Sequence, residues 1–322
     1  MKKIIFIGGT GRSGTNILSK ILQNHSQATG LKFEYRFVID PDGIIDFYNS
    51  YSDIWSPYFV DKKIKRLEKF LSDLAEDKFI HKFVAKILKP INKNGVILSP
   101  RKYSDWELEK HIPNFKKYTK ELISELKEFS YKGIWPGMES YKFFPQMYYG
   151  KPKSQEETRS ILSRFLIKVI NSLLEKNNSE VFIEDNTWNI LFAKELLELI
   201  PEAKIIHIYR DPRDVIFSLS KQRWAPKDLK KTINYYKDII ELWFSIKSKL
   251  NPDSYYEFKF EDLIEFPEKN IRNLCDFIGL DYEPNMINID LTKSNSNKFS
   301  ETQKDEINNI LSHIIIKLGY NE

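Results

Sequence analysis

The opening stretch of the chain passes from an apolar run to a glycine-rich run and then to an amphipathic one. Residues 4–7 are β-branched or aromatic and stop at Gly8, which is typical of a buried strand followed by a turn. Over residues 15–25 the apolar side chains recur on one helical face. The pattern predicts a strand, a glycine loop and a helix, which open an α/β fold. A second short strand is predicted at 29–33.

A similar pattern returns after residue 180. Short apolar runs predict strands at 181–183, 204–209 and 255–259. Helical periodicity predicts helices at 188–199, 214–222, 229–250, 271–278 and 306–318. Because strands alternate with helices, we expect an α/β fold with a mostly parallel sheet flanked by helices on both faces.

Residues 40–178 have a different character. After a strong turn at 40–43 (Asp-Pro-Asp-Gly), charged stretches with helical periodicity follow. They lie at 61–89, 104–129 and 155–177, and an aromatic segment at 131–152 interrupts them. We interpret 40–178 as a large helical insertion on the substrate side of one domain, residues 1–322. A plain cap over the core is the alternative.

Composition narrows the class of protein. The chain has 322 residues with 50 basic and 45 acidic side chains, a net charge of +5, which permits an anionic ligand but does not favour a nucleic-acid partner. The single cysteine, Cys275, excludes an internal disulfide and favours a reducing compartment. No apolar run approaches the roughly 20 residues that span a bilayer. We therefore expect a cytoplasmic protein without stable membrane insertion and leave its oligomeric state open.

The glycine-rich segment 8–16 (Gly-Gly-Thr-Gly-Arg-Ser-Gly-Thr-Asn) lies between the first predicted strand and helix. Glycines let the backbone turn tightly and approach a ligand, and the start of a helix offers free N–H groups to an anion. A phosphate-binding loop is therefore predicted. Its candidate ligands are Gly11, Arg12, Ser13, Gly14, Thr15 and Asn16.

Two other nucleotide-binding loops fit this segment less well. A kinase loop has the same glycine spacing, but Thr15 and Asn16 stand where its lysine and magnesium-binding hydroxyl belong. A dinucleotide loop requires an acidic residue at the end of the second strand, and none is convincing here. A degenerate kinase remains the alternative.

A second signature lies at 205–218, where an apolar strand leads through a charged turn into a helix. Arg210 leaves the strand at its carboxyl end, where ligands bind in open α/β sheets. Ser218 follows eight positions later, one to two turns into the helix. A guanidinium and a hydroxyl that converge there can hold a second phosphate. A surface salt-bridge turn is the alternative.

The two signatures resemble those of sulfotransferases that use 3′-phosphoadenylyl sulfate (PAPS). Residues 12–15 resemble the 5′-phosphosulfate loop of tyrosylprotein sulfotransferases and related bacterial enzymes. Residues 210–218 resemble the family's 3′-phosphate signature, and residues 256–263, 277–280 and 318–320 are similar to later family segments. The resemblance implies a P-loop-like fold, PAPS as co-substrate and no metal. It also implies transfer of a sulfuryl group to a hydroxyl of a carbohydrate, a small molecule or a peptide.

The resemblance also implies roles for single residues. Arg12 would stabilise the leaving group, and Arg210 and Ser218 would hold the 3′-phosphate. Glu34, expected at the end of the second strand, is the candidate catalytic base. It precedes Arg36 in a Glu-x-Arg similar to that of tyrosylprotein sulfotransferases, so Arg36 would orient the base or the substrate.

Each of these assignments has an alternative. His25 is the rival base, and Glu34 is otherwise a surface ion-pair partner. Lys298, in a polar loop, is a further candidate ligand of the 3′-phosphate, with an ordinary exposed lysine as the alternative.

One position departs from the family. At 185–188 the chain reads Asp-Asn-Thr-Trp, where the family usually has Glu/Asp-Lys-Thr-Pro with the lysine near the active centre. Asn186 can donate a hydrogen bond but carries no charge, so it is a candidate substrate-binding residue. Lys221 or Arg223 would then have to supply the missing positive charge. A non-catalytic nucleotide-binding protein is the corresponding alternative.

Overall fold

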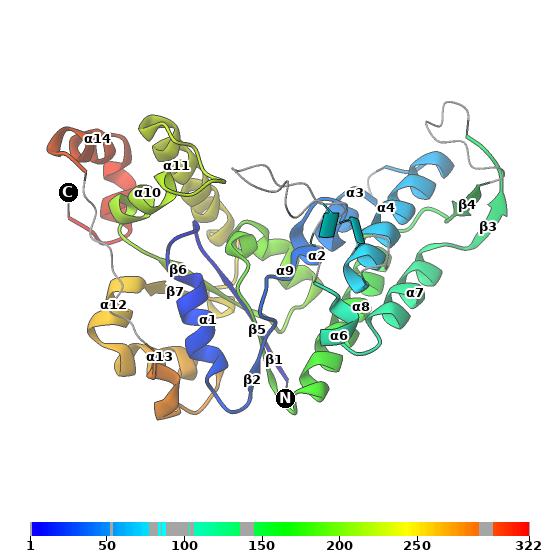
Figure 1. The fold of residues 1–322 in the computed structure, drawn as a ribbon, viewed down its shortest axis with the longest axis horizontal. Helices are drawn as coiled ribbons and strands as arrows, with labels where there is room; N and C mark the ends of the chain where they lie inside the picture. The colour runs from blue at the N-terminus through cyan, green and yellow to red at the C-terminus, as the bar shows by residue number, and fades with distance from the viewer. Residues whose placement is uncertain are drawn as a thin grey trace. The chain divides into compact units, whose positions relative to one another are not determined.

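The computed structural model describes residues 2–51, 54–76, 83–84, 86–87, 103, 106–135, 145–289 and 299–321. The chain divides into two compact units (Figure 1). We call Met1–Tyr35 with Ser179–Glu322 the sheet unit, and Arg36–Asn178 the helical unit. The helical unit contains the predicted insertion at 40–178 and begins slightly before it. That the whole chain acts as one domain stays a prediction.

The described part of the sheet unit contains a five-stranded sheet of order β2-β5-β1-β6-β7, with parallel pairing throughout. Its strands are β1 (Lys3–Gly8), β2 (Ala28–Thr29), β5 (Val181–Glu184), β6 (Lys204–Tyr209) and β7 (Tyr255–Lys259). The predicted parallel α/β sheet is confirmed, and β6 and β7 have the predicted bounds. β2 is shorter than predicted, because only two of its residues pair with β5 at the sheet edge.

One face of the sheet is covered by α1 (Thr15–Gln23), α12 (Phe260–Glu265) and α13 (Pro267–Ile278) (Figure 1). Alternate strand residues such as Ile7 and Ile206 point to this face and pack against Leu18 of α1 and Leu274 of α13. These side chains are fully buried, so removal from water stabilises the layer.

Helices also pack against the opposite face. Apart from the helices of the first face and η3 (Pro284–Ile287), whose Met286 belongs to the core of that first face, the helical segments described in this unit are η1 (Thr187–Phe192), α9 (Ala193–Leu199), α10 (Pro212–Ser220), α11 (Leu229–Lys247), η2 (Pro252–Ser254) and α14 (Glu301–Lys317). On this face Phe6 packs edge-on against Phe182, and His207 packs against Trp243 of α11. α10, α11 and α14 share a second apolar core. The helix predicted at 188–199 begins as a 3-10 turn, and the side chain of Asn186 caps it by accepting from the N–H of Trp188.

The helical unit has its own core and one hairpin. Its elements are α2 (Arg36–Ile39), α3 (Ile44–Tyr51), α4 (Pro57–Ala75), α6 (Leu108–His111), α7 (Phe115–Leu126), β3 (Phe129–Lys132), β4 (Gln146–Tyr149) and α8 (Gln155–Lys176). Phe37, Phe115 and Phe165 meet edge to face in the core. The antiparallel β3–β4 pair was not predicted. In the described ranges, no helix of either unit has the length and apolar run that a bilayer crossing requires.

Candidate functional site

The register of the sheet brings the predicted site segments of the sheet unit to one edge. β1 lies between β5 and β6, with Phe6 opposite Glu184 and Gly8 opposite His207. Because the strands are parallel, the loop after β1 emerges beside the residues that follow β5 and β6. Residues far apart in sequence therefore meet around the loop.

The loop after β1 has a strained, glycine-dependent backbone. Gly11, Arg12 and Gly14 adopt φ of 78°, 61° and 110°. A Cβ atom at Gly14 would lie 2.5 Å from the ring of Phe260, so only glycine fits. The left-handed conformation of Arg12 costs energy for a non-glycine residue, and such strain concentrates at functional sites. Among the side chains that the structure describes, none caps the start of α1 at Gly14, so the first N–H groups of this helix are suited to an anion.

Arg12 joins the loop to the second signature. Its Nε donates a hydrogen bond of 2.9 Å to Oγ of Ser218, 206 positions away in the sequence. Arg12 is itself exposed, so the rest of its guanidinium can meet a ligand. The structure thus brings together two elements that the sequence predicts as separate phosphate-binding sites.

Two buried polar atoms lie beside the loop without a hydrogen-bond partner among the described residues. They are Oγ of Ser13 and Nδ2 of Asn186, and both residues are fully buried. The Asn186 Oδ1 accepts a hydrogen bond of 3.0 Å from the N–H of Trp188, which fixes the side chain. An unsatisfied buried donor costs about 1–3 kcal/mol, so both atoms point to a polar ligand.

Asn16 supports the loop through its side chain. Its Nδ2 donates to Oδ2 of Asp185 at 2.9 Å, which ties α1 to the residue after β5. Burial raises the pKa of Asp185 above its ordinary value, against the opposing effect of this hydrogen bond.

Glu184, at the end of β5, is a buried carboxylate that the sequence analysis missed. Its Oε1 accepts from the N–H groups of Tyr35 at 2.9 Å and Asn186 at 3.0 Å. Its Oε2 accepts from Nδ2 of Asn189, which also donates to the carbonyl of Ile7 at 3.0 Å. Burial raises the pKa of Glu184 to about 7, although these hydrogen bonds favour the charged form. Glu184 therefore links β1, β5 and the segment that carries Glu34. An acidic residue that closes an apolar run was the available signal.

Glu34 lies after β2 rather than at its end, so the expected position was wrong. β2 stops at Thr29, and Glu34 follows in irregular backbone. Its neighbour Tyr35 is anchored by Glu184 and packs its ring edge-on against Phe182 at 5.0 Å. In the helical unit, Arg36 begins α2 and lies 3.7 Å from Asp40. The catalytic role of Glu34 and the substrate role of Arg36 stay predictions.

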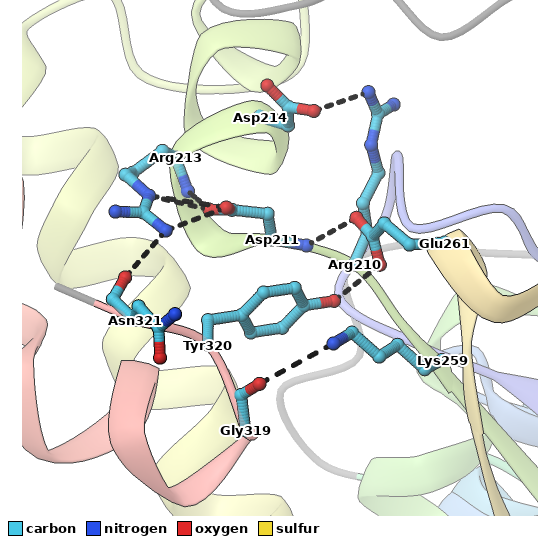
Figure 2. A network of polar contacts seen from close by, with 9 residues as sticks. All are labelled: Arg210, Asp211, Arg213, Asp214, Lys259, Glu261, Gly319, Tyr320 and Asn321. Carbon is cyan, nitrogen blue, oxygen red and sulfur yellow. Dashed lines mark hydrogen bonds and ion pairs between the residues drawn. The ribbon is translucent and has the colours of Figure 1, made fainter.

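Arg210 lies in a network of charged groups (Figure 2). Its Nη2 donates to Asp214 at 2.7 Å, and its guanidinium carbon lies 5.3 Å from the ring centroid of Phe260. Arg213 forms a two-pronged ion pair with Asp211. The salt-bridge turn that was the alternative interpretation is therefore present. Phe260 contacts Arg210 and also lies against Gly14, so the turn and the glycine loop are neighbours, and the phosphate-binding role of Arg210 stays a prediction.

The other candidate site residues from the sequence have different surroundings. His25 accepts from the N–H of Gln27 at its Nδ1 and contacts the carbonyl of Asp281 with its Nε2 at 2.9 Å, which favours a structural role. Lys221 lies 3.7 Å from the ring centroid of Phe217. Lys298 falls outside the described residues. Among the residues that the structure does describe, no three His, Cys, Asp or Glu side chains are grouped to hold a metal ion.

A parallel α/β sheet with two candidate anion-binding elements at its carboxyl edge is typical of phosphate-binding proteins. Comparison with known proteins narrows the class. The model of the sulfotransferase family matches residues 95–284, which is more than half of the chain and includes Arg210 and Ser218. The chain belongs to the sulfotransferase family.

Individual relatives share shorter segments. The omega-hydroxy-beta-dihydromenaquinone-9 sulfotransferase Stf3 of Mycobacterium tuberculosis is 30% identical over 136 residues, which are 38% of this chain and 35% of that protein. Its Mycobacterium bovis counterpart matches equally. The chain therefore spans about a third of the length of these curated relatives. An uncharacterised protein of Aquifex aeolicus is 33% identical over 33% of this chain and 15% of its own length.

A solved structure extends the likeness in fold. The sulfotransferase domain from the curacin biosynthetic pathway matches with a TM-score of 0.50 over 100% of this chain and 99% of that chain. The identity is 13%, so this likeness concerns the fold alone.

The loop geometry predicts that Gly14→Ala destabilises the sheet unit more than Gly319→Ala. Both glycines have positive φ, but a Cβ at Gly319 meets nothing within 4 Å. Each substitution should cost about 1–3 kcal/mol from backbone strain, and Gly14→Ala should cost a further ~1–3 kcal/mol from overpacking against Phe260. Urea unfolding of the two variants measures the difference. Equal losses would show that the contact with Phe260 does not constrain the loop.

Glu184 predicts a pH-dependent loss of stability. The folded protein holds this proton up to about pH 7, whereas the unfolded chain releases it near 4.5. The contribution of Glu184 to the free energy of unfolding should therefore fall by about 3 kcal/mol as pH rises across this window. Urea unfolding of the wild type and of Glu184→Gln at pH 5 to 8 measures it. The stability of the wild type relative to the variant should decrease with pH, and parallel profiles would contradict the prediction.

Proposed function

We propose that this protein transfers a sulfuryl group from PAPS to a hydroxyl-bearing acceptor. The observation that carries the proposal is the hydrogen bond from Arg12 to Ser218. It joins the loop proposed to bind the 5′-phosphosulfate to the helix proposed to bind the 3′-phosphate. Membership of the sulfotransferase family supports the same reaction.

The residues present fit this donor. The glycine turn, the uncapped start of α1 and the unpartnered Ser13 hydroxyl suit the 5′-phosphosulfate, and Arg210 with Ser218 suits the 3′-phosphate. All are hydrogen-bond donors or cations, as an anion requires. When bound, PAPS supplies an activated sulfuryl group on its 5′-phosphate.

The side chains of the sheet unit then have separate tasks. Arg12 and the loop N–H groups stabilise the negative charge that develops on the departing phosphate oxygen. Glu34 accepts the proton of the acceptor hydroxyl, whose oxygen forms the new bond to sulfur. Glu184 holds the backbone beside Glu34 through the N–H of Tyr35, so the base is fixed relative to the loop.

Asn186 provides a neutral amide where the family usually has a lysine. Its Nδ2 is buried and without a partner among the described residues, so it can donate one hydrogen bond to the donor or the acceptor. Arg12 is then the principal positive charge of the loop, and we infer that the reaction depends on it more strongly than in enzymes with the lysine.

The acceptor class remains broad. We propose a hydroxyl of a carbohydrate, a small molecule or a peptide, with no nucleic acid as partner and a cytoplasmic location. The mycobacterial relatives named above are sulfotransferases of a hydroxylated menaquinone, so an isoprenoid alcohol belongs in the acceptor panel.

The proposed roles predict different defects for two substitutions. Glu34→Gln should lower transfer of labelled sulfate from PAPS by about 10²–10⁴-fold, as for loss of a general base, and leave binding of adenosine 3′,5′-bisphosphate intact. Arg12→Ala should weaken both transfer and binding. Radiolabel transfer and titration calorimetry measure the two properties.

Glu202→Gln is the matched control, because Glu202 is exposed and precedes β6 at the opposite edge of the sheet. It should behave like the wild type. A wild type that neither turns over any acceptor class nor binds the bisphosphate would refute the proposal. Binding without turnover would favour a non-catalytic nucleotide-binding protein, and magnesium-dependent binding of ATP would favour a degenerate kinase.

A further inference from the structure

Residues 319–321, which follow α14, fold back onto the turn that carries Arg210 (Figure 2). The hydroxyl of Tyr320 donates a hydrogen bond of 2.5 Å to Oε2 of Glu261. The other oxygen of Glu261 accepts from the N–H of Asp211 at 3.1 Å. Two hydrogen bonds therefore connect Tyr320 to the peptide group directly after Arg210.

Further contacts hold Tyr320 and Asn321 in place. The ring of Tyr320 meets that of Tyr209 edge-on, with centroids 6.4 Å apart, and Nζ of Lys259 lies 4.2 Å from its centroid. Nη2 of Arg213 donates to the carbonyl of Asn321 at 3.0 Å. Residues on both sides of Arg210 are thus in contact with this segment.

The side chain of Arg210 depends on the same helix start. Phe260 and Glu261 are the first two residues of α12. Phe260 lies against the guanidinium of Arg210, while Glu261 holds the N–H that follows it. One helix start therefore supports both the side chain and the backbone of Arg210, and Tyr320 fixes that helix start. Burial, together with the charge of Glu261, raises the pKa of Tyr320, so its hydroxyl stays a donor.

We propose that Tyr320, acting through Glu261, is a positioning residue that sets Arg210 for a nucleotide 3′-phosphate. It thereby determines the preference for a 3′-phosphorylated nucleotide over the same nucleotide with a 3′-hydroxyl. The inference rests on the proposed PAPS-binding function. Its physical basis is geometric, because the charge-assisted hydrogen bonds of a guanidinium to a phosphate weaken when the donor atoms are displaced.

The test compares two nucleotides in Tyr320→Phe, which removes one oxygen atom. Adenosine 3′,5′-bisphosphate carries the 3′-phosphate, and adenosine 5′-monophosphate is the same nucleotide with a 3′-hydroxyl. Titration calorimetry should show that the variant binds the bisphosphate about tenfold more weakly, the loss of one net hydrogen bond, and binds the monophosphate as the wild type does. A merely structural role would change both affinities alike, so the ratio of the two is the decisive quantity.

Two further variants sharpen the test. Tyr282→Phe is the matched control, since Arg272 lies over the ring of Tyr282 in another part of the sheet unit, and its affinities should equal those of the wild type. Glu261→Gln should reduce the affinity ratio as Tyr320→Phe does. The double variant should lose no more than the larger single loss, because the two residues act in one chain of contacts.

The outcomes separate the two proposals. If the wild type prefers the bisphosphate and Tyr320→Phe leaves the affinity ratio unchanged, the positioning role is wrong and the proposed function stands. If the wild type binds neither nucleotide, the proposed function fails and the positioning role fails with it. If Tyr320→Phe does not fold, the ratio measured for Glu261→Gln decides, and an unchanged ratio overturns the inference.

Discussion

The parallel pairing of β1 with β5 on one side and β6 on the other is the constraint on which the site of the sheet unit depends. This register sets the end of β1 beside Glu184 and beside the residues that lead to Arg210. The bond from Arg12 to Ser218 is possible only because two segments separated by most of the chain start from neighbouring strands. A shift of one residue in either pairing would turn the apolar side chains to the wrong face of the sheet. The packing of the core and the geometry of the site therefore require the same strand register.

The sequence was most informative where local pattern and tertiary role agree. Strands with a buried middle, such as β6, are rich in apolar residues and have clear ends. A loop whose backbone requires glycines can be recognised from those glycines in the sequence. The edge strand β2 was placed wrongly, because its length depends on where the chain turns away from β5, which itself continues to Glu184; that is a non-local property. Glu184 was missed for a related reason. In the sequence, a glutamate that accepts hydrogen bonds from three buried N–H groups cannot be told from an exposed glutamate. Only the tertiary contacts distinguish the two.

Charge in the second signature is balanced locally. Asp214 pairs with Arg210, and Asp211 pairs with Arg213, so the turn gains little attraction for anions at long range. The protein's excess of five positive charges is therefore not concentrated at this turn. Under the proposed function, recognition at this turn would depend instead on the direction of donor groups at short range, which favours a compact ligand over an extended polyanion.

Phe260 affects the spacing between the glycine loop and Arg210 as well as the packing of the core. Its ring lies against Gly14 and also against the guanidinium of Arg210, so a single side chain separates the glycine loop from the turn that carries Arg210. A larger or smaller residue at this position would alter both elements together. The distance between the loop and Arg210 is thus set in part by the size of one ring, and a change at this position would shift both segments at once.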